Sequence, residues 1–173
     1  MKKLIALLCA FTTLAFAGCS TRNDDNQDTT TTAPASQGTT TTSEKEENLS
    51  AKTLFDKAKA ALGEIPATVT LDEEMFKELY GEGDVEEFIC EIPAMNVHAT
   101  EICVVKFKKN ITEDEAEKFF KKRQDSLEQT WKNYLPDQYE IVKDSKVEVR
   151  GPYALFCVGE RADEAEKAFE KAY

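Results

Sequence analysis

The fold is decided by VEEFICEI at Val85–Ile92, followed after a short connection by TEICVVKFK at Thr100–Lys108. In both stretches apolar side chains recur at every second position, which is the period of a β-strand. Pro93 ends the first stretch. Because the connection is so short, we expect the two strands to form an antiparallel hairpin. Alternation predicts that Phe88, Cys90 and Ile92 share one face of the first strand. In the second strand Cys103, Val105 and Phe107 alternate with Ile102, Val104 and Lys106.

Outside this hairpin, helical and extended patterns alternate along the chain. Helices are predicted at Leu49–Leu62, Glu73–Tyr80, Thr112–Leu135 and Asp163–Tyr173, with a short extended piece at Ala67–Leu71. Further strands are predicted at Tyr139–Val142 with Lys146–Arg150, broken by polar residues, and at Tyr153–Val158. The order ααββαββα predicts a single α+β domain over residues 49–173, with an antiparallel sheet of about four strands and packed helices. Since Tyr153–Val158 is apolar on both sides, we place it centrally and expect cover on the second face, by the N-terminal helices.

Helix ends are marked by capping residues. Ser50 and Asp72 are expected N-caps, and Gly63 a C-terminal stop. Thr112 and Glu115 have the spacing of a capping box. Pro136 is expected to end the longest helix.

The N-terminus has the pattern of an export signal. Lys2 and Lys3 precede an apolar run that is too short to span a membrane. Phe16, Ala17 and Gly18 then stand before Cys19. This resembles the bacterial lipobox, although Leu is commoner where Phe16 stands. The resemblance implies a signal peptide at 1–18 and acyl chains on Cys19, which would hold the chain on the lipid bilayer at the outer face of the cytoplasmic membrane. A plain secretory signal with an incidental cysteine is the alternative.

Residues 19–48 form a threonine-rich, low-complexity stretch. It contains the runs Thr29–Thr32 and Thr39–Thr42 and almost no apolar side chains. Such a composition cannot repay the entropy of ordering, so we predict a disordered linker.

Charge and composition exclude several function classes. With 22 basic and 33 acidic residues, the net charge is −11. We therefore expect no nucleic-acid partner; the acidity serves solubility or, alternatively, a basic partner. His98 is the sole histidine, and neither a phosphate-binding glycine loop nor a nucleophile elbow occurs. No cofactor and no metal are predicted.

Three cysteines lie in predicted strands, namely Cys90, Cys103 and Cys157. Buried free thiols are the favoured interpretation. One cross-strand disulfide is the next, and a metal site is the least favoured, since zinc-ligand spacing is absent.

Several motifs together resemble one protein family. They are Leu79-Tyr80-Gly81, Val85, Pro93–Val97, Glu101-Ile102, Lys106, Arg123, Trp131, Leu135–Tyr139 and Gly151-Pro152-Tyr153. These resemble the DUF4358 family of uncharacterised bacterial lipoproteins, found largely in Firmicutes. The resemblance covers about Leu49–Tyr173 and implies no assigned activity.

The favoured functional hypothesis is a surface-displayed, non-enzymatic module that binds a protein, a peptide or a cell-wall component. An accessory lipoprotein of a membrane or transport complex and a cell-wall-directed enzyme are the alternatives. Because connections carry function more often than strands do, the ligand-binding surface is expected at Met95–His98, with Asn96 and His98, and with Tyr80 nearby. That Asn96 only makes a turn is the competing interpretation.

Overall fold

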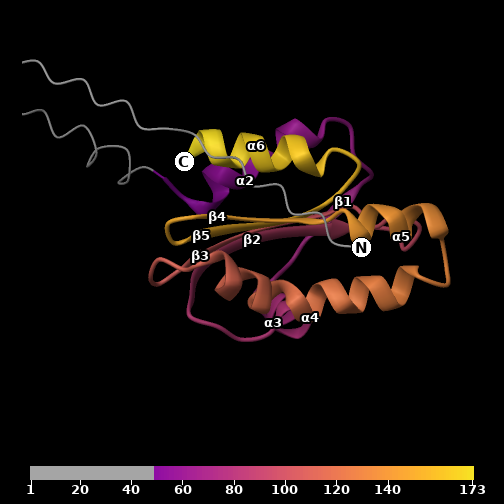
Figure 1. Ribbon diagram of the computed structural model, residues 1–173, viewed down its shortest axis with the longest axis horizontal. Coiled ribbons are helices and arrows are strands. Elements are labelled where there is room, and N and C mark those ends of the chain that lie inside the picture. The colour runs from indigo at the N-terminus through magenta and orange to yellow at the C-terminus, as the bar shows by residue number, and fades with distance from the viewer. Residues whose placement is uncertain (1–48) are drawn as a thin grey trace, which may run out of the picture. The chain divides into compact units, whose positions relative to one another are not determined.

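The computed structural model describes residues 49–173, so the predicted signal peptide, Cys19 and the predicted linker lie outside the described residues. These residues form an α+β domain, as expected (Figure 1). Its elements are α2 (Ala51–Leu62), β1 (Thr68–Thr70), α3 (Glu73–Tyr80), β2 (Val85–Pro93), β3 (Glu101–Phe107), α4 (Glu113–Trp131), α5 (Pro136–Lys143), β4 (Lys146–Arg150), β5 (Tyr153–Val158) and α6 (Ala162–Ala172).

All neighbouring strands of the sheet are antiparallel, in the order β1-β2-β3-β5-β4. The predicted hairpin is confirmed as β2 and β3, with Phe88 opposite Val105. β5 is an interior strand between β3 and β4 and is buried along its whole length, as its two-sided apolar pattern predicts, although β3 is the middle strand. The sheet has a fifth strand because the short piece that contains Val69 pairs with the end of β2.

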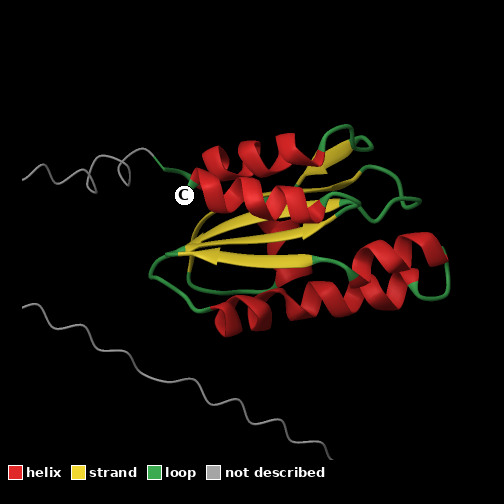
Figure 2. Cartoon of the chain, turned by 45° about the horizontal axis from the view of Figure 1, so that its top comes forward, coloured by secondary structure: helices red, strands yellow, loops and turns green. Residues whose placement is uncertain are grey.

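Helices cover both faces of the sheet (Figures 1 and 2). On one face α2 and α6 pack on the side chains of Ile102, Val104 and Leu155. On the other face α3, α4 and α5 pack on Val105 and Phe156 and their neighbours. The expected cover of the second face is therefore correct for α2, whereas α3 lies on the opposite side.

The predicted caps are present. The Ser50 and Asp72 side chains accept hydrogen bonds from the first turns of α2 and α3, and Gly63 ends α2 with a φ of 76°. Thr112 and Glu115 form the complete capping box of α4.

The prediction of a strand at Tyr139–Val142 is wrong, because this segment lies in α5. Pro136 ends the long helix as expected, but it also occupies the first turn of α5, where its fixed φ favours a helix. Tyr139 and Val142 are three residues apart and both turn toward the core, which is helical spacing. The long helix also ends at Trp131, short of the predicted Leu135.

The favoured interpretation of three free thiols is wrong for two of them. Cys90 and Cys103 are directly opposite on β2 and β3 and form a disulfide. Cys157 is a free, buried thiol on the other face of the sheet. Its burial raises the pKa of the Cys157 thiol to about 12, so this group stays protonated and inert.

Among residues 49–173, no helix has the length and apolarity needed to cross a membrane. The same residues contain no cluster of three or more histidine, cysteine or acidic side chains arranged to hold a metal ion.

Candidate functional site

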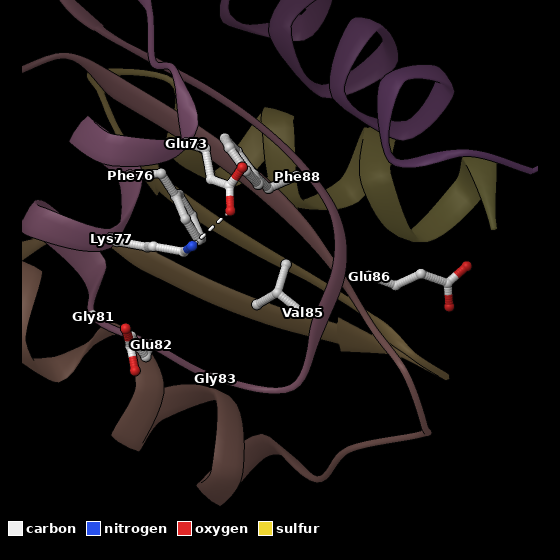
Figure 3. Close-up of a pocket in the computed structure, with 9 residues that line it drawn as sticks. All are labelled: Glu73, Phe76, Lys77, Gly81, Glu82, Gly83, Val85, Glu86 and Phe88. Carbon is white, nitrogen blue, oxygen red and sulfur yellow. Dashed lines mark hydrogen bonds and ion pairs between the residues drawn. The ribbon is translucent and has the colours of Figure 1, made fainter.

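A cleft of about 530 Å³ opens between α3 and the outer edge of the sheet (Figure 3). Its walls are α3, the loop that follows α3, and the first half of β2. The lining residues are Glu73, Phe76, Lys77, Gly81, Glu82, Gly83, Val85, Glu86 and Phe88.

Local sequence explains why the chain doubles back here to enclose a cleft. Asp72 begins α3 by accepting a hydrogen bond from the Met75 N–H at 2.9 Å. Gly81 ends the helix with a φ of 95°, a conformation that residues with a Cβ rarely adopt. At Gly83 a Cβ would lie 2.9 Å from the Phe119 ring, so only glycine allows the loop to pass this close to α4. The turn from α3 into β2 therefore depends on these two glycines.

The floor of the cleft is apolar. The Phe76 and Phe88 rings stack with their centroids 4.0 Å apart and their planes within 10°, and Val85 lies beside them (Figure 3). Phe76 is buried, whereas Phe88 and Val85 are partly exposed. An apolar floor that remains partly open to solvent is typical of a binding cleft.

The rim of the cleft is charged and mostly acidic. Lys77 binds Glu73 at 2.6 Å across one helical turn, and this hydrogen bond and charge lower the pKa of Glu73. Glu86 points away from the other lining side chains (Figure 3) and pairs with Lys106 at 2.7 Å. Glu82 is exposed on the loop. Over the 15 residues from Glu73 to Glu87 the chain carries seven acidic side chains and one basic side chain.

The strand that borders the cleft has an open backbone edge. β1 pairs with β2 only at residues 91–93, and the last bond on that side runs from the Leu71 N–H to the Cys90 carbonyl. Since outward and inward groups alternate along an antiparallel strand, the N–H and C=O of Phe88 also point to this outer side. Within residues 49–173 no strand pairs with Phe88 there.

A buried ion pair fixes α3 and α4 to the centre of the sheet. Glu101, the first residue of β3, is fully buried. Arg123 of α4 donates to it through Nε at 2.8 Å and through a second guanidinium nitrogen at 2.5 Å. The Tyr80 hydroxyl, at the end of α3, donates to the same carboxylate. Because a buried carboxylate is costly unless paired, these contacts determine where α3 lies, and hence the position of one wall of the cleft.

The Tyr80–Glu101–Arg123 cluster has a structural role. Burial, and then the charge of Glu101, raise the pKa of the Tyr80 hydroxyl well above its usual value. Tyr80 therefore stays protonated and keeps donating. The large cleft is lined by other residues, so the cluster does not face it.

The structure separates the residues predicted to bind a ligand. Tyr80 is only 2% exposed and belongs to the buried cluster, not to a surface. Asn96 is exposed in the connection between β2 and β3. His98 lines a smaller cavity of about 220 Å³, together with Gln138 and Arg161. Gln138 accepts a hydrogen bond from the Ala99 N–H at 2.8 Å, which attaches this connection to α5.

The cleft residues and the partners of Tyr80 were missed from sequence. A signal existed for Glu101, because an acidic residue begins a strand that is otherwise almost entirely apolar. Gly81-Glu82-Gly83 indicated a loop, but the spacing of glycines in a sequence does not show that the loop borders a cleft. The stacking of Phe76 on Phe88 joins two elements that periodicity treats separately.

The fold and the cleft define a small α+β domain whose antiparallel sheet has one open, cleft-lined edge. The family model described as "Domain of unknown function (DUF4358)" matches residues 62–159, which is more than half of the chain. The chain therefore belongs to the DUF4358 family. No curated protein and no solved structure matches it.

Proposed function

We propose that this chain is a lipid-anchored lipoprotein on the outer face of the cytoplasmic membrane, and that its domain at 49–173 binds a partner without chemical turnover. The observation that carries the proposal is the order of segments in the sequence. A short apolar leader, small residues before Cys19, a threonine-rich stretch and a folded domain follow one another. Each is a part that a tethered surface module needs.

The form of the domain supports a binding role. The cleft beside α3 combines an apolar floor, a charged rim and a volume of about 530 Å³, within the range of ligand sites. The most deeply buried charged group, Glu101, is fully engaged by Arg123 and Tyr80. That carboxylate is therefore committed to holding the fold together.

The anchor is tested by metabolic labelling with a tagged fatty acid in cells that express the full chain. We expect label on the wild type and none on Cys19→Ser. Cys9→Ser is the matched control and keeps the label, since Cys9 would leave with the leader. Label retained by Cys19→Ser would contradict the lipid assignment.

The binding role is tested by cross-linking in cells, followed by assay of the purified full chain on cell-wall fragments. A cross-linked partner with no product formed supports a binding module. Product formation from wall fragments would overturn it in favour of an enzyme. A membrane protein that co-purifies only when Cys19 is intact would favour the accessory lipoprotein.

A further inference from the structure

The cleft beside α3 offers two kinds of contact that an extended peptide can use. The backbone N–H and C=O of Phe88 are unpaired on the outer side of β2 within the described domain. The stacked Phe76 and Phe88 rings provide an apolar surface immediately beside them. Sheet edges of this kind bind extended peptides by adding a strand, with alternate side chains entering neighbouring pockets.

The opposite edge of the same sheet, β4, also has no strand partner on its outer side within residues 49–173, but charged side chains border it. β4 carries a charged side chain at every second position, namely Lys146, Glu148 and Arg150. Lys146 binds Asp163 of α6 at 2.7 Å, and Arg150 binds Glu170 of the same helix. Charged side chains along an edge strand are a common protection against strand addition. β2 also carries charged side chains toward α2, where Glu87 accepts from the Ala51 N–H and Glu91 pairs with Lys59. The edges differ on the other face of the sheet, where Val85 and Phe88 of β2 line an open cleft.

The acidic side chains beside the β2 edge indicate which kind of segment could bind there. Glu82 and Asp84 are exposed on the loop and form no salt bridge within residues 49–173. A second copy of the chain would bring the same acidic segment against itself. The chain's own stretch from Ser20 to Asn48 has six acidic and two basic side chains, so it too is repelled. A basic peptide is the complementary partner.

We propose that the open edge of β2 binds an extended, basic peptide segment of a partner protein, which pairs with the backbone of Phe88 and places an apolar side chain on Phe76 and Phe88. The inference rests on the proposed binding function and specifies the class of partner. Lysine or arginine side chains of the peptide lie against Glu82 and Asp84.

The test is a selection of linear random dodecapeptides, displayed on phage, against the full chain held in zwitterionic detergent. We expect selected peptides to be rich in lysine or arginine, with apolar residues at alternate positions. Glu82→Lys with Asp84→Lys should weaken their binding by at least about tenfold. The control pair Glu117→Lys with Glu160→Lys changes the net charge equally at exposed positions outside the cleft and should leave binding unchanged.

A backbone measurement then separates strand addition from simple charge attraction. Bound peptide should slow hydrogen exchange of the Phe88 amide. The proposal is overturned if no peptide is selected, if the selected peptides are acidic, if the two charge pairs behave alike, or if the Phe88 amide is unaffected. If a partner cross-linked in cells binds the Glu82→Lys, Asp84→Lys chain as well as the wild type, the binding function stands and this site is wrong.

Discussion

The two edges of the sheet differ in the side chains that lie beside their unpaired backbone groups. β4 is bordered by charged side chains that α6 engages, through Lys146 to Asp163 and Arg150 to Glu170. β2 likewise carries Glu87 and Glu91, which contact α2. On its other face, however, Val85 and Phe88 are partly exposed and line the cleft beside α3. An unprotected edge invites pairing, so a domain that protects one edge and leaves the other open has a surface suited to a partner.

The open edge is also the one that is held most firmly to the rest of the domain. The Cys90–Cys103 disulfide joins β2 to β3, and the Tyr80–Glu101–Arg123 cluster fixes α3 on the same face. A binding cleft gains affinity from walls that do not need to be ordered on binding.

The largest effect is expected from Arg123→Ala. This change leaves the Glu101 carboxylate buried without its cation, which should lower the free energy of unfolding by about 3–5 kcal/mol. Urea denaturation measures it. Arg150→Ala removes the partly exposed pairs of the β4 edge and should cost about 1 kcal/mol or less. Equal losses in the two variants would show that the cluster does not anchor α3.

Loss of the disulfide comes next. Cys90 and Cys103 are 13 residues apart, and replacing both with alanine should lower the free energy of unfolding by about 3 kcal/mol through a less constrained unfolded chain. Thermal unfolding with and without a thiol reductant measures this. The reductant should destabilise the wild type and leave the double variant unchanged. A wild type insensitive to the reductant would argue that the two thiols are free.

A smaller effect, on self-association, is expected when charged side chains are removed from the β4 edge. Lys146→Val with Arg150→Val removes two of the three charged side chains along β4, and this variant should self-associate with a dissociation constant on the order of 0.1 mM. Analytical ultracentrifugation measures it. Lys121→Val with Lys52→Val, at exposed helical positions, removes equal charge and should remain monomeric. Association of both pairs would mean that net charge alone, and not edge protection, controls it.

Local patterns were sufficient to predict most of the domain. Alternation predicted β2 and β3 as a hairpin, and the apolar run on both sides of β5 predicted an interior strand. The caps Ser50, Asp72 and Thr112 marked helix starts. The prediction of a strand at Tyr139–Val142 was wrong because a short apolar run is compatible with a strand or a helix equally. Its position directly after Pro136 favoured the helix.

The candidate site could not be predicted in the same way, because it depends on contacts between distant segments. Phe76 stacks on Phe88 only because α3 folds back over β2, and Tyr80 reaches Glu101 across 21 residues. The edge is open because β1 is only three residues long, and periodicity cannot fix where pairing stops. The loop chosen from sequence, with Asn96 and His98, is at the other end of β2.

Amide hydrogen exchange of the free, full chain tests most directly whether β2 presents an open edge. Ile89 faces β3 in the ladder opposite Val104, whereas the neighbouring Phe88 amide points outward. We expect the Phe88 amide to exchange at least about 100-fold faster than the Ile89 amide. Equal protection of Phe88 and Ile89 would mean that the edge is already covered and would contradict the account.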